Sequence, residues 1–148
     1  MAGMRLTSHN DFALRTLIFL ACHRGRRVTT REVADAFDIS HPHLLKVVNQ
    51  LGRLGVIEVK RGKNGGISLA REPERISIGS VLRTLEDDSH LVECFDDERN
   101  QCVISPACVL KKALARALEA FYGELDGLDL GTVVSGKRAT HLRKLLRP

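Results

Sequence analysis

Apolar residues recur at helical spacing near the start of the chain. The positions i, i+3, i+4 and i+7 of this first pattern are Leu14, Leu17, Ile18 and Ala21. Such spacing gives a helix one continuous apolar face, so we expect a helix over this stretch. Its start is expected at Thr7 or Ser8, whose hydroxyl groups can accept a backbone N–H, and its end at Gly25.

A second and a third helix are predicted directly after the first. Residues 29–32 read Thr-Thr-Arg-Glu, the spacing of a capping box, and predict a short helix over about residues 30–37. Ser40 can cap a further helix, which Gly55 ends. The apolar stripe of this third helix consists of Leu44, Val47, Val48, Leu51 and Leu54. The pattern therefore predicts two short helices joined by a tight turn.

A β-hairpin is predicted after the third helix. Residues 56–60 and 67–69 are strand-like, and the Asn-Gly pair at residues 64–65 favours a tight turn between them. Arg61 and Lys63 make the tip of this hairpin basic. A helix-turn-helix followed at once by a basic hairpin is the pattern of a winged helix, in which the third helix enters the major groove and the hairpin contacts the neighbouring backbone or minor groove.

The charge distribution agrees with a surface that binds DNA. The chain has 148 residues and a formal net charge of +5, but residues 1–75 carry +6, residues 76–110 carry −5 and residues 111–148 carry +4. A basic first part suits a surface that faces phosphates, whereas the acidic middle segment must lie away from them. The candidate DNA-binding residues are Thr29, Ser40, His41, Pro42, His43, Lys46, Arg61, Lys63 and Asn64. The alternative is a winged helix that serves protein contacts only.

Composition disfavours several other classes of protein. The longest apolar run, residues 17–22, is far shorter than the roughly 20 residues that cross a bilayer. The first residues lack the order of a secretory signal, so we expect a cytoplasmic protein with reduced thiols. Aromatic residues make up only 4% of the chain, which disfavours base stacking on single-stranded nucleic acid. We find no pairing of a nucleophile with a base, and expect no enzyme activity.

Three of the four cysteines lie close together in the acidic middle segment. Cys94, Cys102 and Cys108 are spaced Cys-x7-Cys-x5-Cys, whereas Cys22 lies on the apolar face of the first helix and is expected to be a small buried residue. Thiolates are soft ligands that favour iron–sulfur clusters, zinc and Cu(I). A cubane cluster or a tetrahedral ion needs a fourth ligand from elsewhere. The residues alone leave three hypotheses: an iron–sulfur cluster, a zinc site, or a thiol redox switch without a cofactor.

A long amphipathic helix is predicted from Ser105 onwards, with Ser105 as its N-cap. Its apolar stripe consists of Leu110, Leu114, Ala117, Leu118, Phe121 and Leu125. A winged helix has a core of its own, so little else in a short chain covers this stripe, and we expect it to pair with a second copy. The basic tail at residues 137–148 is expected to be a solvated end. The fold class is therefore mainly α with a small β-hairpin wing: a winged helix-turn-helix plus a long C-terminal dimerisation helix.

These motifs together resemble a known family over nearly the whole chain. The chain is similar to the dimeric winged-helix regulators that include IscR, NsrR and RirA. The resemblance rests on Met-Arg-Leu-Thr at residues 4–7, Asp-Phe-Ala-Leu-Arg at 11–15, Ile39-Ser40 before the third helix, the Arg-Gly and Gly-Gly pairs of the wing at 61–62 and 65–66, and the three-cysteine loop. It implies an iron–sulfur cluster held by Cys94, Cys102 and Cys108, expected to be 4Fe–4S, with 2Fe–2S as the alternative.

The fourth ligand that the resemblance implies differs between members of the family. IscR-like members place a His three residues after the last cysteine, where this chain has Lys111. NsrR-like members have an acidic residue in the first helix, which reaches the cluster of the other subunit, and Asp11 fits that position. RirA-like members share the long gap between the first two cysteines but tend to have Asn in place of Asp11. The resemblance therefore leans towards the NsrR type, although a first-turn carboxylate is also favoured by the helix dipole alone.

The resemblance implies a homodimeric repressor that binds a near-palindromic operator while its cluster is intact and leaves the DNA when nitric oxide attacks the cluster. Two alternatives stand beside it: a regulator that responds to iron or cluster supply, as RirA-like and IscR-like members do, and a winged-helix binding module switched by zinc or thiols. The expected organisation is a DNA-binding domain over residues 1–80, a cluster-binding helix and loop over 81–108, and a dimerisation helix with the tail over 106–148.

Overall fold

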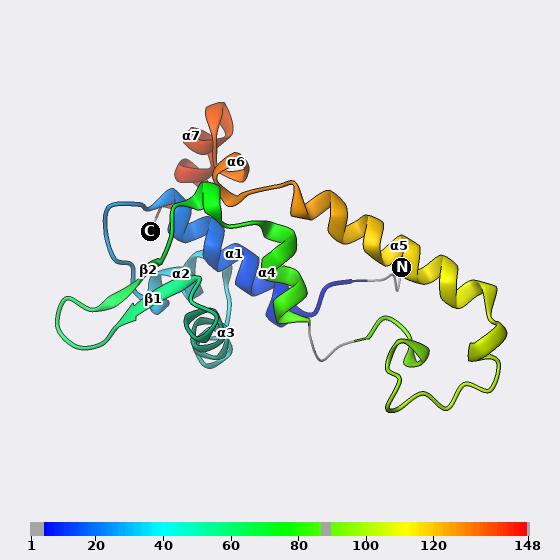
Figure 1. Cartoon of the computed structure of the whole chain (residues 1–148). Coiled ribbons are helices and arrows are strands. Elements are labelled where there is room, and N and C mark those ends of the chain that lie inside the picture. Colours follow the sequence, from blue (N-terminus) through cyan, green and yellow to red (C-terminus); the bar gives the residue numbers. More distant parts are fainter. Residues whose placement is uncertain (1–4, 87–89, 148) are drawn as a thin grey trace. The chain divides into compact units, whose positions relative to one another are not determined.

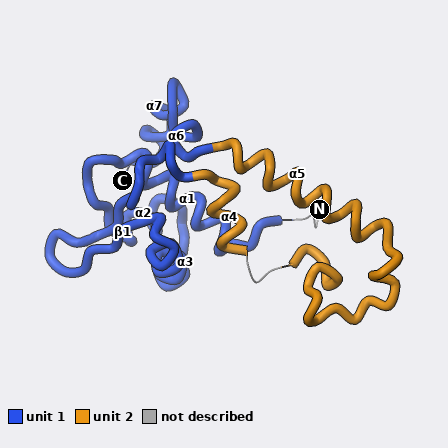
Figure 2. Tube along the Cα trace, in the orientation of Figure 1, with its two compact units in different colours: residues 1–76, 129–148 blue, residues 77–128 orange. Residues whose placement is uncertain are grey.

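The computed structural model describes residues 5–86 and 90–147, and Figure 1 shows a mostly helical chain with one β-hairpin. The chain forms two compact units, residues 1–76 with 129–148 and residues 77–128 (Figure 2). The last segment of the chain, which we had grouped with the dimerisation helix, thus belongs to the first unit. The division of the chain by function stays a prediction. Among the described helices, none is both long and apolar enough to cross a membrane.

The first unit begins with the three helices expected from the sequence. Helix α1 spans Ser8–Cys22, and the Thr7 side chain caps it by accepting the N–H of Asn10. Helix α2 spans Thr30–Phe37 and has the full capping box between Thr29 and Glu32. Burial raises the pKa of the Glu32 carboxyl, but its hydrogen bonds to Thr29 and Arg26 outweigh burial and hold the pKa below its ordinary value.

Helix α3 spans His41–Arg53 and follows a tight turn in which Asp38 adopts a left-handed conformation, with φ of 51°. Ser40 occupies the N-cap position, but its side chain makes no capping hydrogen bond, so that part of the expectation is wrong. Pro42 stands in the first turn and has no N–H, so one of the two usual donors to a capping hydroxyl is absent. Proline in the first turn itself favours the start of a helix.

The predicted hairpin forms from strand β1, Ile57–Lys60, and strand β2, Gly66–Leu69, in antiparallel register. A further antiparallel bridge pairs Val28 with Ile67 of β2, so one residue of the segment before α2 pairs alongside the hairpin. Gly66 makes this close approach feasible, because it has a φ of 134° and a Cβ there would lie 2.6 Å from the carbonyl oxygen of Val28.

The core of the first unit is built from the apolar faces predicted for these helices. Its largest fully buried side chains include Phe19, Leu17, Leu44, Leu51, Ile67, Leu130, Val28, Val33, Val47 and Val48. Burial of one such side chain stabilises the fold by about 1.5–3 kcal/mol. Helices α1 and α2 pack against α3, α3 packs against β1, and α1 packs against β2. The core therefore holds α3 by its apolar face and leaves its opposite face to solvent.

The C-terminal tail is folded, which corrects the expectation of a solvated end. Helices α6, Leu130–Val133, and α7, Gly136–Leu145, follow the long helix of the second unit. Leu130 is fully buried, and its N–H donates to the carbonyl oxygen of Ile76 at 2.9 Å. Ala139 and Leu146 are also buried. Basic residues in the tail concealed these apolar anchors in the sequence.

The second unit contains helix α4, Ile78–Leu85, the cysteine loop and helix α5, Val109–Asp126. We expected the long helix to begin at Ser105. Residues Ser105–Ala107 instead form a short 3₁₀ turn, η3, so the helix begins later. The extended backbone of Cys108, with ψ of 111°, separates this turn from α5. Cys108 is the N-cap, and its Sγ accepts the N–H of Lys111 at 3.2 Å. A candidate metal ligand thus also caps the long helix.

Helices α4 and α5 pack closely in the second unit. A Cβ at Gly79 would lie 2.5 Å from the backbone nitrogen of Asp126, so only glycine allows this approach. Arg83 of α4 pairs with Glu119 at 3.2 Å and with Asp126 at 3.0 Å. These ion pairs and the close approach at Gly79 hold α4 against the C-terminal half of α5. Most residues of the N-terminal half of α5 are exposed or half-buried.

Candidate nucleic-acid interface and cysteine loop

Helix α3 presents a polar stripe opposite its buried face. Pro42, Leu45, Lys46 and Asn49 are exposed and follow the spacing i, i+3, i+4 and i+7. Pro42 and Lys46 are among the residues predicted to contact DNA, whereas Leu45 is not. A recognition helix uses such a stripe to meet base edges in the major groove. The stripe is therefore the candidate reading surface of the first unit.

The histidines at the start of α3 are engaged within the protein. His41 Nε2 lies 2.8 Å from the Thr30 hydroxyl on α2. The His43 ring packs edge-on against Phe12 of α1, with ring centroids 4.8 Å apart. His9, also on α1, hydrogen-bonds Gln50 of α3. The N-terminal end of α1 thus holds α3 through two separate side-chain contacts.

The remaining candidate DNA-binding residues lie where a duplex can reach them. Ser40 and Thr29 are exposed at the start of α3 and α2. The hairpin tip presents Arg61, Lys63 and Asn64 to solvent, and Asn64 takes a left-handed φ of 61° in the turn. The tip therefore combines two cations with a turn residue that its backbone requires.

The three loop cysteines are free thiols. Cys94 lies in the 3₁₀ turn η2, Glu93–Phe95, and is half-buried, as is Cys108, whereas Cys102 is exposed. Local hydrogen bonds organise the loop: Asp96 accepts the N–H groups of residues 98 and 99, and Asn100 accepts the N–H of Cys102. The loop thus presents thiols on short turns. Cys22 is buried in α1, and burial raises the pKa of its thiol.

The cysteines do not converge in this conformation. Within residues 5–86 and 90–147, no group of three or more His, Cys, Asp and Glu side chains is placed to hold a metal ion. The soft-donor chemistry fits an iron–sulfur cluster, since all three sulfurs are unoxidised. Their positions do not yet form a site. Lys111, at the position of the IscR-like histidine, instead donates through Nζ to the Ser105 hydroxyl at 3.2 Å.

Asp11 lies in the first turn of α1 and forms an ion pair with Arg15. Its carboxylate Oδ2 is 2.6 Å from Arg15 Nη2, and the two side chains are 43% and 42% exposed. Arg15 also lies over the Phe12 and Phe37 rings, 5.7 and 5.8 Å from their centroids. Asp11 is thus accessible and already engaged by a neighbour on its own helix.

The predicted dimer stripe on α5 is mostly accessible within the described chain. Leu110 is 64% exposed and Phe121 is 37% exposed, and Ala117 is also exposed, while Leu114, Leu118 and Leu125 are half-buried. Val103, Ile104 and Val109 add exposed apolar surface beside the last cysteine. Isolated monomers rarely keep so large an apolar surface in water. This surface suits a partner, and the identity of that partner stays a prediction.

Tyr122 of α5 makes contacts with residues near and within α4 that the sequence did not reveal. It is buried, its hydroxyl donates to the Glu86 carboxylate, and Arg83 lies over its ring at 4.4 Å from the centroid. Burial, followed by the hydrogen bond to Glu86, raises the pKa of Tyr122 to about 12. An aromatic residue in the long helix gave no signal of this role, because its partners are remote in sequence.

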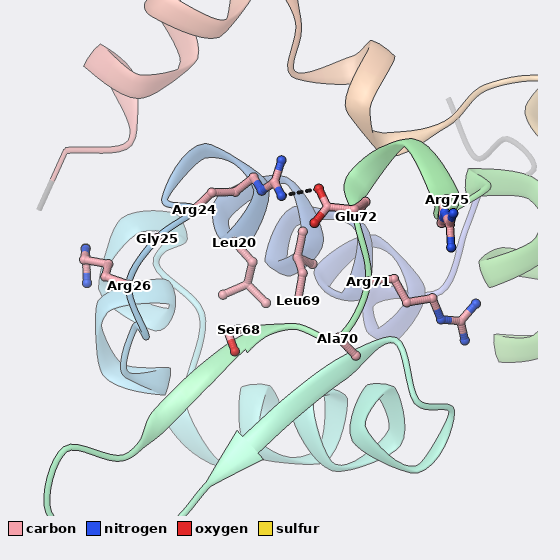
Figure 3. Close-up of a pocket in the computed structure, with 10 residues that line it drawn as sticks. All are labelled: Leu20, Arg24, Gly25, Arg26, Ser68, Leu69, Ala70, Arg71, Glu72 and Arg75. Atoms are coloured by element: carbon pink, nitrogen blue, oxygen red, sulfur yellow. Dashed lines mark hydrogen bonds and ion pairs between the residues drawn. The ribbon is translucent and has the colours of Figure 1, made fainter.

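A pocket of about 490 Å³ lies between the end of α1 and the segment after β2 (Figure 3). Four arginines line it, but two are paired with acids: Arg24 with Glu72, and Arg26 with Glu32 at 2.9 Å. Figure 3 shows the Arg26 side chain directed away from the Arg24–Glu72 pair. The Arg24–Glu72 pair ties the end of α1 to the chain that follows the wing, so we assign these residues a structural role.

Comparisons with known proteins agree with this architecture. The model of the Rrf2 family, described as iron-dependent transcriptional regulator, matches residues 6–136. The HTH-type transcriptional regulator NsrR of Bacillus licheniformis is 46% identical over 97% of this chain and 99% of its own length. The chain belongs to the Rrf2 family. Another similar relative, the HTH-type transcriptional regulator NsrR of Shouchella clausii, is 48% identical over 97% of this chain and 96% of its own length.

The Rrf2 assignment confirms the predicted family and the predicted fold. The solved structure of T. potens IscR has the same fold, with a TM-score of 0.70 over 89% of this chain and 87% of that chain, at 22% identity. The chain is accordingly a DNA-binding transcriptional repressor of the Rrf2 family.

Proposed function

We propose that this Rrf2 repressor is a homodimer whose operator binding is controlled by an iron–sulfur cluster that reacts with nitric oxide. The observation that carries the proposal is the loop of three free thiols, Cys94, Cys102 and Cys108, at the start of the long helix. Relatives named NsrR at 46% and 48% identity support the same function. Because a transcriptional repressor acts on DNA, the proposal places the protein in the cytoplasm. The proposal includes no enzyme activity.

The loop has to rearrange before its three sulfurs can share one cluster, since they do not converge in this conformation. Cys102 is exposed and lies on a loop without regular helix or strand, so a change of a few backbone angles can bring its sulfur inwards. Cys108 is held by the first turn of α5. When bound, a cluster would supply iron atoms with which nitric oxide reacts.

Asp11 is the proposed fourth ligand, donated to the cluster of the other subunit. A carboxylate is a hard ligand and binds weakly to a soft cluster, so it leaves one position open to attack. When Asp11 is not a ligand, it pairs with Arg15 on its own helix. In one state, the Asp11–Arg15 pair holds the first turn of α1, and in the other the bond from Asp11 to the cluster would hold it.

The first turn of α1 is also where α3 is held. Phe12 packs on His43, and His9 bonds Gln50, so a shift of this turn moves the recognition helix directly. A change at one ligand thus biases the position of a DNA-reading element, which is the requirement for a two-state switch. Pairing of α5 between subunits would fix the spacing of two such helices on a near-palindromic operator.

The experiment is operator binding by the anaerobically reconstituted, full-length protein. Operators are selected from random duplexes, and binding is measured by fluorescence anisotropy before and after addition of nitric oxide. The proposal predicts near-palindromic sites and release by nitric oxide. Cys102→Ser should abolish the response, whereas Cys22→Ala, a change of the buried cysteine outside the loop, should keep it. Operator binding that is indifferent to nitric oxide in the reconstituted wild type would contradict the proposal.

A second candidate is a regulator that responds to iron or cluster supply, and the iron-dependent description of the Rrf2 family favours it. In that case, removal of iron by a chelator releases the operator and nitric oxide at equal equivalents does not. A zinc module, the third possibility, would carry zinc without acid-labile sulfide. Metal and sulfide analysis of the same preparation separates these outcomes.

A further inference from the structure

One exposed apolar side chain in the winged helix has no structural explanation. Among residues 5–76, the large apolar side chains exposed to solvent are Leu45 on α3 and Val59 on β1. Val59 covers Gly52 of α3, because a Cβ at Gly52 would lie 3.4 Å from Val59 Cγ2. Leu45 is 40% exposed and points away from the buried face that Leu44 and Val48 form.

Leu45 lies at the edge of the candidate reading surface, next to the buried face of α3. Pro42 precedes it by three residues, and Lys46 and Asn49 stand beside it on the same face. His43 and His41, by contrast, are engaged with Phe12 and Thr30 and have less freedom to meet a base. The exposed side chains of the stripe are therefore two apolar groups, Pro42 and Leu45, beside two polar groups, Lys46 and Asn49. Of the two apolar groups, Leu45 has the longer side chain.

The major groove presents one apolar group among its donors and acceptors, the C5 methyl of thymine. A leucine on a reading surface is best covered by an apolar group, since a polar base edge opposite it would be left without a hydrogen-bond partner. We propose that Leu45 is a specificity-determining residue that contacts the C5 methyl of a thymine in each half-site. The proposal rests on DNA binding by α3 in the proposed function, but not on the cluster or on nitric oxide.

Replacement of thymine by deoxyuridine removes that methyl and nothing else, so it tests the contact without changing the protein. Each thymine of the selected half-site is replaced in turn, and the dissociation constant of the wild-type complex is measured by fluorescence anisotropy. One position should bind about fourfold more weakly, since one buried methyl group is worth about 0.8 kcal/mol. The other thymines should tolerate the change.

The variant Leu45→Ala completes the test. Its preference for thymine over deoxyuridine at the sensitive position should fall to about one, while its circular dichroism spectrum stays that of the folded wild type because the side chain lies outside the fully buried core. The matched control Lys46→Gln, a neighbour on the same stripe, should weaken binding but keep the preference. The proposal is overturned if no thymine is sensitive to loss of its methyl, or if Leu45→Ala keeps the preference. Neither result affects whether the wild type binds its operator, so DNA binding itself is judged separately.

Discussion

The carboxylate of Asp11 accepts a hydrogen bond from the Arg15 guanidinium, one helical turn later, at 2.6 Å. In the proposed switch, this pair gives Asp11 a partner while it is not a ligand, and the carboxylate is accessible enough to exchange Arg15 for another partner. The same turn of α1 carries Phe12, which packs on His43 of the recognition helix. Asp11 is thus both the proposed cluster ligand and the neighbour of a residue that contacts the recognition helix.

Removal of the Asp11 carboxylate should uncouple the reaction with nitric oxide from the change in operator affinity. In Asp11→Ala, the cysteines keep their iron, but the change in operator affinity on addition of nitric oxide falls towards one from the 5- to 150-fold or so that is typical of coupled sites. Iron per monomer and anisotropy titrations with and without nitric oxide measure both quantities. Asp35→Ala, which removes an exposed carboxylate of α2, is the control. An unchanged nitric oxide response in Asp11→Ala would remove Asp11 from the switch.

The wing should contribute affinity without sequence preference. Lys63 is exposed at the hairpin tip and is a candidate for a phosphate contact. We expect Lys63→Gln to weaken binding to all duplexes alike and to reduce the slope of log affinity against log salt by about 1. Lys112→Gln removes an equally exposed cation from α5 and should leave the slope as it is. An unchanged slope in Lys63→Gln would exclude the tip from the interface.

Tyr122 is the only tyrosine in the chain, so its ionisation can be followed by ultraviolet absorbance. Burial and the hydrogen bond to Glu86 raise its pKa from 10 to about 12. A raised pKa means that its contribution to the free energy of unfolding is fully present below pH 10 and is lost as the pH rises to about 12. Glu86→Gln should move the titration towards 10, because the charged acceptor is gone. A wild-type midpoint near 10 in protein that is still folded by circular dichroism would contradict this environment.

The capping box of α2 makes a separate, structural prediction. Thr29→Ala removes the side chain that accepts the Glu32 N–H at 3.1 Å, and should lower the free energy of unfolding by about 1 kcal/mol. The Glu32 carboxyl has a lowered pKa, so its contribution is present near neutral pH and is lost as the pH falls through that pKa. The same loss from Thr140→Ala, an exposed threonine of α7, would show that the effect is not the cap.

Local patterns predicted the winged helix because each element carries its own signals. The spacing of Leu44, Val47 and Leu51 fixed the buried face of α3, and the capping box fixed the start of α2. The hairpin formed as predicted, but the five residues 61–65 connect its strands in place of a tight Asn-Gly turn. Such signals depend on residues within one or two turns, and the structure confirms them.

The predictions failed where the partners of a residue are remote in sequence, or where a neighbouring residue imposes a different backbone conformation. Ser105 looked like an N-cap, but the backbone of Cys108 interrupts the helix, and Leu130 anchors a tail that looked solvated. The packing of His43 on Phe12 brings together positions on two helices, and no pattern within either helix encodes it.

The most direct test of the central claim is the absorption spectrum and native mass of the anaerobically purified protein, recorded before and after a few equivalents of nitric oxide per monomer. The account predicts a coloured dimer with one cluster per subunit on Cys94, Cys102 and Cys108, which reacts stoichiometrically with nitric oxide. A protein that stays colourless after anaerobic reconstitution with iron and sulfide would contradict the account, and would leave zinc or thiol chemistry as the function of the same loop.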